Sequence, residues 1–184
     1  MKKITILLTA ALIAANTNSA NADNYKYVPY IGLDYTYTDI SAKGFSPSFN
    51  TAGIHIGSEY SQYFGTELFF NQSDHHKRSH TGYKNKQSYR AYGLDIAAYL
   101  PVGCAKKLSM LATAGIGEYV FNIKNYPQKH HNEHGYGYRF GGGIKYNITP
   151  NWQIRIMSRY VKFDHISGYN HGTEYTAGAE YHFN

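Results

Sequence analysis

The last twelve residues of the chain, 173–184, read TEYTAGAEYHFN and alternate between two kinds of side chain. Successive residues of an extended strand point to opposite faces. One face would carry small and aromatic residues, Thr173, Tyr175, Ala177, Ala179, Tyr181 and Phe183, and the other would carry Glu174, Glu180 and His182. A soluble sheet would bury the aromatic face, whereas a membrane barrel would turn it towards lipid and enclose the carboxylates. The fold therefore depends on which face is inside.

The start of the chain predicts export. Lys2 and Lys3 precede an apolar run of about a dozen residues, 4–15, which has the length of a signal-peptide core and is too short to cross a bilayer as a helix. Residues 20–22, Ala-Asn-Ala, have the small-x-small form of a cleavage site. We expect a signal peptide over residues 1–22 and a single domain over residues 23–184.

The composition fits neither a helical membrane protein nor a disordered chain. The 184 residues include 20 Tyr and 18 Gly, and the net charge of +6 falls to +4 once Lys2 and Lys3 are removed. Tyrosine is amphipathic and accumulates where apolar surface meets water. After residue 22 the sequence has no apolar run of about 18 residues, so no transmembrane helix is expected. The single cysteine, Cys104, cannot form an internal disulfide.

Segments of alternating hydrophobicity recur through the rest of the chain. We predict strands at residues 27–39, 50–60, 63–72, 88–100, 108–122, 136–146, 152–162 and 173–184. Each has about ten residues or slightly more, which is the length of a tilted strand that spans a bilayer. In segment 108–122 the alternation places Glu118 on the apolar side, so we expect either a bulge there or emergence from the bilayer.

The polar faces of these segments combine glycine with single charges. The acidic residues are Asp34, Glu59, Glu67, Asp95, Glu174 and Glu180, and the basic residues are Arg139, Lys145, Arg155 and Arg159. In a soluble sandwich these charges would face bulk water. Glycine among them favours the opposite arrangement, because side chains just fill the crowded interior of an eight-stranded barrel. We predict an all-β fold, an eight-stranded antiparallel up-and-down transmembrane barrel, with these ten residues as a polar network that plugs the lumen.

The connections between the predicted strands alternate in length. Short turns lie near residues 61–62, 101–107 and 147–151, and long connections cover residues 40–48, 73–87, 123–133 and 164–172. Tight periplasmic turns and long outer loops are typical of outer-membrane barrels. Closure also removes free sheet edges, which hydrocarbon does not tolerate. The aromatic face of residues 173–184 is therefore predicted to face lipid.

Three stretches resemble a known family. The ending GAEYHF, followed by Asn184, is similar to the terminal aromatic signal of outer-membrane barrels. The stretch YNITPNWQIRIMSRYVKF (146–163) resembles the turn and seventh strand of the small barrels that include the opacity proteins and the OmpA-like barrels, and SAKGFSPSFNTAGIHIGSEYS (41–61) resembles neisserial surface protein A. The resemblance implies a surface-exposed protein of the bacterial outer membrane that contacts host molecules through its loops. Relatives often carry glutamate where Met157 stands.

An enzyme is the alternative from another class, because small outer-membrane barrels include lipid A deacylases and acyltransferases. Such an enzyme needs a serine and a histidine within hydrogen-bond reach, oriented by a third group. His165 and Ser167 form the nearest pair, but the asparagine-containing segment of the deacylases does not follow them, and Ser158 has no adjacent base. We expect no catalytic site and no cofactor.

Histidines gather in the predicted outer loops and raise the possibility of a metal site. They are His75, His76, His80, His130, His131, His134, His165 and His171, whereas His55 and His182 fall on the luminal faces of strands. Imidazole suits zinc, copper or nickel. No cysteine accompanies them, and adjacent histidines do not easily reach one metal. We favour a solvated, weakly cationic loop and expect no metal ligand.

Basic residues crowd the second long connection. They are His75, His76, Lys77, Arg78, His80, Lys84 and Lys86, with Arg90 at the strand end. We expect them to meet the phosphates of lipopolysaccharide or sulfated host glycans, more strongly when histidine is protonated below about pH 6.5. The location excludes nucleic acid as a partner. The protein is predicted to be a monomer embedded in outer-membrane lipid.

Overall fold

The computed structural model describes residues 27–42, 46–74, 76–80, 83–103, 107–125, 130–166 and 168–183, so the predicted signal peptide lies outside the described residues. The strands are β1 (Val28–Ala42), β2 (Ser48–Ser61), β3 (Phe64–Ser73), β4 (His76–His80), β5 (Tyr83–Val102), β6 (Leu108–Asn125), β7 (His130–Asn147), β8 (Trp152–Asp164) and β9 (Tyr169–His182). Across the described residues, no helix is long and apolar enough to span a membrane.

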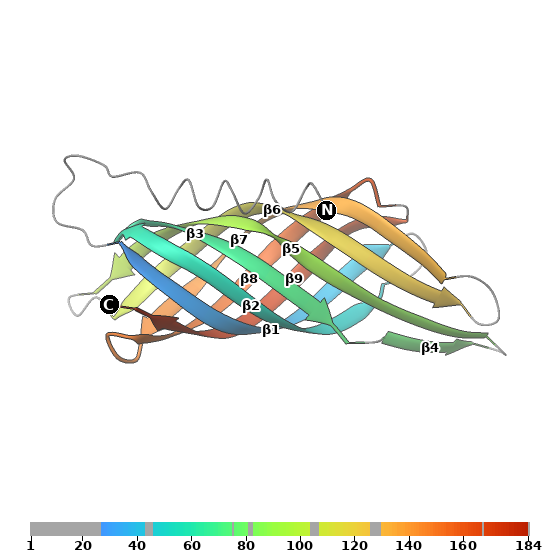
Figure 1. Ribbon diagram of the computed structural model, residues 1–184, viewed down its shortest axis with the longest axis horizontal. Coiled ribbons are helices and arrows are strands. Elements are labelled where there is room, and N and C mark those ends of the chain that lie inside the picture. The colour runs from blue at the N-terminus through green and yellow to red at the C-terminus, as the bar shows by residue number, and fades with distance from the viewer. Residues whose placement is uncertain are drawn as a thin grey trace.

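The strands form one closed antiparallel sheet (Figure 1). Apart from β3 and β4, strands that are neighbours along the chain pair with each other, β1 pairs with β9, and the additional pairing of β3 with β5 completes the ring. The short strand β4 follows β3 along the same partner, β5, so β3 and β4 together occupy one position in the wall. The predicted eight-stranded up-and-down barrel is confirmed.

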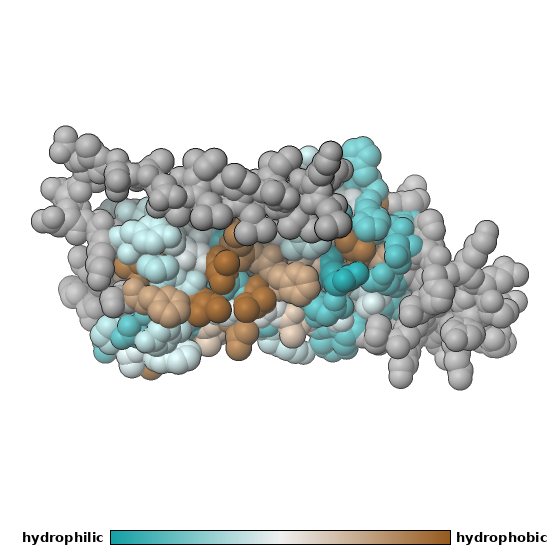
Figure 2. All heavy atoms as spheres, viewed as in Figure 1, coloured by the Kyte–Doolittle hydropathy of each residue, from teal (hydrophilic) through white to brown (hydrophobic). Residues whose placement is uncertain are grey.

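The burial of side chains along β9 shows which face of this strand lies inside the barrel. Glu174 and Glu180 are buried at 0% and 1% exposure, whereas Tyr175 is 55% exposed. The same alternation runs through the other strands, with Leu33 and Ile156 exposed on the outer face. Figure 2 shows apolar side chains gathered in the middle of the visible face and hydrophilic ones towards the end that carries β4. The charges are inside, and the apolar face is outside.

Rings of aromatic residues mark both ends of the apolar outer face. At the end with the C-terminus and the short turns, which we call the turn end, Tyr27, Tyr63, Phe64, Tyr146, Trp152 and Phe183 are exposed. Towards the opposite end, which we call the loop end, Tyr37, Phe70, Tyr136, Tyr138 and Tyr175 are exposed. Aromatic girdles of this kind are typical of the two water interfaces of a membrane barrel.

Several strands run further towards the loop end than the sequence predicted. Residues 73–87 and 123–133 were expected to form loops, but β4, β5, β6 and β7 occupy most of them. The pairing of β6 with β7 continues to Lys124 and His130, and β5 pairs with β6 as far as Asn85 and Asn125. The prediction was wrong because a polar hairpin can extend an existing ladder by backbone hydrogen bonds without hydrophobic alternation.

The expected bulge at Glu118 is also absent. In β6 the register with β5 and β7 continues through Glu118, which pairs with Tyr92 and Tyr136. Its carboxylate lies on the outer face, 3.4 Å from Nδ1 of His134. A polar pair beside outer tyrosines fits the other expectation, that the strand emerges from the bilayer here.

A charge placed on the outer face tests this orientation. We expect Ala177→Arg, on the apolar outer face of β9, to lower the free energy of unfolding by about 2–4 kcal/mol, because the guanidinium would enter hydrocarbon. Asn132→Arg, on an exposed site of the loop end, is the control and should change it by about 1 kcal/mol or less. Urea unfolding in phospholipid vesicles measures both, and equal effects would contradict the proposed orientation.

Candidate functional site

Arg155 is the centre of the charged lumen. Its guanidinium contacts three carboxylates: Asp34 at 2.6 Å, Glu67 at 2.6 Å and Glu180 at 3.0 Å. Two bonds reach Asp34, from Nε at 3.2 Å and from Nη2 at 2.6 Å, in the forked geometry that arginine makes with a carboxylate. These carboxylates come from β1, β3 and β9, so one side chain of β8 ties three other strands together across the interior.

His55 completes this central cluster. Its Nδ1 lies 3.0 Å from Asp34 and its Nε2 lies 3.4 Å from Glu180. Glycines opposite the ring and the carboxylate make the close packing possible: a Cβ on Gly32 would collide with His55, and a Cβ on Gly178 would collide with Asp34. The glycine-rich polar face of the sequence is therefore the crowded face.

A second cluster lies next to the first, further towards the loop end. Nη2 of Arg139 lies 3.3 Å from Glu174 and 3.5 Å from Asp95, and its guanidinium covers the ring of Phe69 at 3.6 Å. Arg159 approaches the same two carboxylates at 3.7–4.0 Å. The contacts in this cluster are longer than those of Arg155.

A third cluster closes the lumen towards the turn end. Nζ of Lys145 lies 2.7 Å from Glu59 and 3.0 Å from Glu180, and it lies over the ring of Tyr99 at 4.6 Å. His182 contacts the same oxygen of Glu180 as Lys145 does, Oε2, at 3.2 Å, and it stacks on Tyr30. Glu180 thus links the central cluster to the turn end.

The structure brings all ten sequence-predicted lumen residues together on the inner face. Nine are classed as buried and Glu59 is half-buried, and every one is joined to another by an ion pair: Asp34, Glu59, Glu67, Asp95, Arg139, Lys145, Arg155, Arg159, Glu174 and Glu180. Six carboxylates face four arginine or lysine groups. The imidazole rings of His55 and His182 lie beside this acidic excess, next to Asp34 and Glu180.

One group of residues with metal-binding side chains lies inside this network. Atoms of His55, Glu67 and Glu180 all lie within 4.8 Å of one another. Nη1 of Arg155 already lies 2.6 Å from Glu67 and 3.0 Å from Glu180, so a guanidinium supplies the positive charge that a metal would bring. We therefore assign these residues to the ion-pair network.

Met157, at the position where relatives often carry glutamate, packs into an apolar patch of the lumen. It is 3% exposed and clusters with Ala97, Tyr99 and Leu111. Met157 therefore interrupts the charged network on β8, and Arg155 and Arg159, the luminal residues on either side of it, supply the charges of this strand.

An aromatic plug, which was not predicted from the sequence, fills the lumen towards the loop end. Its buried members are Ile40, Phe49, Phe69, Tyr89, Ala91, Tyr119, Phe121, Val161, Phe163, Ile166 and Tyr169. Phe121 stacks on Tyr169 at 4.4 Å and meets Phe163 edge-on at 5.8 Å. Tyr119 donates a hydrogen bond to Glu174 at 3.0 Å, which joins the plug to the charged clusters. The signal in the sequence was the luminal phase of Tyr89, Tyr119 and Phe121 near the loop-end limits of the predicted strands 88–100 and 108–122.

At the loop end, backbone register aligns four basic residues. Lys77 pairs with Lys86, Lys86 with Lys124, and Lys124 with His130, so one residue from each of β4, β5, β6 and β7 lies in a single row, which we call the cationic row. Directly opposed residues on neighbouring strands share a face of the sheet. The backbone register thus gathers four basic residues at one level of the barrel wall.

The seven predicted anion-binding residues map onto this region in part. His76, Lys77, Arg78 and His80 are in β4, and Lys84 and Lys86 are in β5, whereas His75 lies outside the described residues. The prediction missed Lys124 and His130, because the register that brings them beside Lys86 is not visible in the sequence.

The catalytic alternative finds no assembled group in the part of the chain that the structure describes. Nδ1 of His165 lies 3.0 Å from Asp164 in an exposed turn, and Ser167 lies outside the described residues. Ser158 lies on the apolar outer face of β8, opposite Gly142 and Tyr175.

Of the remaining loop histidines, those with described side chains are separated from one another. His134 pairs with Glu118, and His171 stacks on Tyr160 at 5.4 Å. The one group of metal-binding side chains among the described residues includes neither of them.

Comparison with known proteins decides the family. The profile of the family described as outer membrane protein beta-barrel domain matches residues 6–183, nearly the whole chain. The chain belongs to this family. No curated protein matches this outer-membrane barrel by sequence.

Solved structures share the fold of this outer-membrane barrel at low sequence identity. Neisserial surface protein A aligns with a TM-score of 0.72 at 13% identity, over 84% of this chain and 97% of that one. Ail, the attachment invasion locus protein of Yersinia pestis, in complex with the heparin analogue sucrose octasulfate, aligns with a TM-score of 0.63 at 15% identity, over 86% of this chain and all of that one. The N-terminal barrel domain of Pseudomonas aeruginosa OprF aligns with a TM-score of 0.57 at 14% identity, over 84% and 97%.

Removal of Arg155 tests the central cluster. We expect Arg155→Ala to lower the free energy of unfolding of the outer-membrane barrel by about 3–5 kcal/mol, because Asp34, Glu67 and Glu180 would lose their shared partner. Arg159→Ala on the same strand is the matched control and should cost less, since its ion pairs are 3.7–4.0 Å long. Urea unfolding in lipid vesicles gives the ranking, and a larger loss from Arg159→Ala would refute it.

The charged clusters and the aromatic plug together predict a closed lumen. In planar bilayers the wild-type barrel should give no large steady conductance steps, because ion pairs block the middle of the lumen and Phe121 and its neighbours block the loop end. A porin reconstituted in the same lipid serves as the positive control. Steady steps that scale with the amount of barrel inserted would show that the lumen is open.

Proposed function

We propose that the protein is a surface-exposed, non-enzymatic barrel of the bacterial outer membrane whose loop end binds sulfated or phosphorylated sugars. The cationic row is the observation that carries this proposal. Lys77, Lys86, Lys124 and His130 are held side by side by the backbone register of four strands. An anionic polymer lying across the strands would relieve their mutual repulsion, which water and salt do only in part.

The position of the row supports the same function. The short turns at the opposite end are those that face the periplasm in barrels of this type, so the loop end would face the cell exterior. Arg90 and His134 lie four residues closer to the membrane along their strands, in register with Val120 between them. Basic residues therefore continue from the row towards the outer tyrosines, where lipopolysaccharide phosphates would lie.

A likeness to Ail is consistent with this ligand chemistry. That protein has been solved with a heparin analogue, a densely sulfated sugar. The shared fold alone does not transfer the ligand, because loops and strand ends carry specificity on such scaffolds. The proposal for this chain accordingly rests on its own cationic row.

Charge removal from the row tests the function. We expect Lys86→Gln/Lys124→Gln to weaken binding to heparin and to lipopolysaccharide vesicles about thirtyfold at low salt, at about 1 kcal/mol for each lysine near an anionic surface. Surface plasmon resonance with folded protein in detergent measures both ligands. Wild-type binding should weaken with added salt, and it should strengthen below about pH 6.5, where histidine gains a proton.

Lys107→Gln/Lys162→Gln is the matched control, since it removes the same charge from exposed residues at the turn end and on β8. This control should leave the affinity for both ligands within about twofold of the wild-type value. If both double variants lost the same binding affinity, the effect would come from net charge alone, and the cationic row would not be the binding site. Comparing heparin with lipopolysaccharide vesicles separates binding to a host-type sulfated glycan from binding to the envelope lipid. Mass analysis of lipid A after incubation with the barrel would detect a lost or gained acyl chain, and such a change would favour the enzyme alternative.

A further inference from the structure

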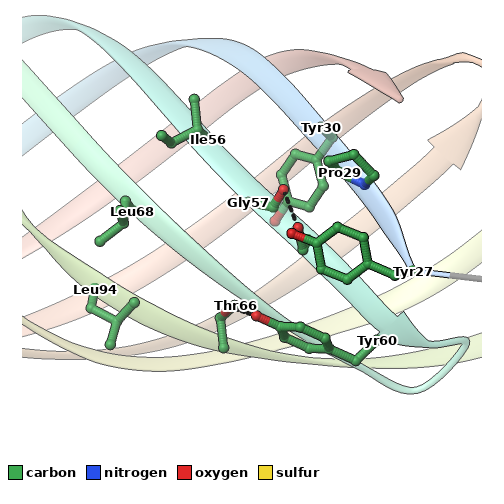
Figure 3. A pocket seen from close by; sticks show the side chains of 10 residues that line it. Tyr27, Pro29, Tyr30, Ile56, Gly57, Tyr60, Thr66, Leu68 and Leu94 are labelled. Atoms are coloured by element: carbon green, nitrogen blue, oxygen red, sulfur yellow. Dashed lines mark hydrogen bonds between the residues drawn. The ribbon is translucent and has the colours of Figure 1, made fainter. Parts of the chain in front are cut away.

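A hollow of about 320 Å³ is recessed into the outer wall of the barrel near the turn end (Figure 3). It lies across β1, β2, β3 and β5 and is lined by Tyr27, Pro29, Tyr30, Ile56, Gly57, Ser58, Tyr60, Thr66, Leu68 and Leu94. The outer face has a second hollow, of about 440 Å³, across β1, β7, β8 and β9, but the one near the turn end is bordered by aromatic residues, and its shape has a structural cause.

Register explains the recess. Pro29, Ser58 and Thr66 lie in one row across β1, β2 and β3, and all three have short side chains. The adjacent row towards the loop end contains the larger Ile56, Leu68 and Leu94. Tyr27 and Tyr60 stand on the other side of the short row, with ring centroids 5.8 Å apart. A row of short residues between two rows of large ones forms a groove.

The hydroxyls of Tyr30, Ser58, Tyr60 and Thr66 in this groove have partners within the protein. Ser58 donates a hydrogen bond to the carbonyl oxygen of Gly57 at 2.9 Å, and the hydroxyls of Tyr60 and Thr66 lie 2.8 Å apart (Figure 3). On the luminal side, Tyr30 packs against Gly57, where an added Cβ would come within 2.5 Å of its ring. With these four hydroxyls paired, the groove offers its occupant mainly apolar surface, which suits hydrocarbon.

We propose that this groove binds one acyl chain of a phospholipid in the leaflet at the turn end. It continues the apolar outer face, which the proposed membrane location places against lipid. The rings of Tyr27 and Tyr60 at its rim, with Phe64 in contact with Tyr60, belong to the girdle that lies at headgroup level in membrane barrels. An acyl chain in the groove would therefore place its headgroup beside these tyrosines, where their polar ends meet water.

The groove also distinguishes one lipid from the surrounding bilayer. A chain in a recess contacts protein on several sides, and each buried methylene adds dispersion contacts that a lipid on a convex wall lacks. The bound lipid should consequently exchange more slowly than the rest and remain with the barrel through detergent purification.

Native mass spectrometry of the barrel released from detergent tests this proposal. Wild-type protein extracted from membranes and washed in detergent should retain one phospholipid. Ser58→Phe fills the groove with a ring and should reduce the retained fraction at least fivefold. Ala114→Phe adds the same ring to an exposed site on the outer face of β6, outside the groove, and should retain phospholipid as the wild type does.

The proposal is overturned if Ser58→Phe and Ala114→Phe retain equal amounts of lipid, or if the wild type retains none. It is also overturned if the wild type is a dimer that Ser58→Phe converts to a monomer, since the occupant would then be a second copy of the chain. The migration of unheated protein in a denaturing gel checks that each variant is folded. Failure of the membrane location itself would look different, because the processed protein would then be soluble without detergent.

Discussion

Arg155 contacts carboxylates from β1, β3 and β9, and this one guanidinium determines much of the architecture. Three carboxylates cannot face hydrocarbon, and their shared cation cannot leave without stranding them. The charged faces of the strands must therefore turn inward together, which turns the aliphatic and aromatic faces outward. Closure of the ring through the β3–β5 pairing then leaves no open sheet edge in the barrel wall, as hydrocarbon requires.

The two ends of the barrel differ in what the lumen and the outer wall contain. Towards the loop end the interior changes from ion pairs to an aromatic plug, and the wall continues into the paired strands that carry the cationic row. Towards the turn end the outer wall contains the groove at Ser58 and Thr66. Both proposed sites arise from cross-strand rows: like charges adjoin in one row, and short side chains adjoin in the other. The ion-pair network of the lumen lies between these two rows.

Much of the fold could be predicted from the sequence, because alternation along a strand is a local property. The faces of residues 173–184, the strand number and the inward position of Arg139, Arg155 and Glu174 all follow from a period of two. Strand ends and cross-strand neighbours could not be predicted from local alternation. The extension of β5 and β6, the alignment of Lys86 with Lys124, and the meeting of Phe121 with Tyr169 depend on register between segments that are distant in sequence. Register is set by all the strands together.

Direct observation of which side chains contact lipid tests the orientation on which everything else depends. With methyl-labelled protein in bilayer nanodiscs, nuclear Overhauser effects should connect lipid acyl chains to the methyl groups of Leu33, Ile56 and Ile154, which lie on the outer face. The methyl groups of Met157, Val161 and Ile40, which are buried in the lumen, should show none. Contacts from lipid to the second set and not to the first would contradict an apolar exterior around a charged interior.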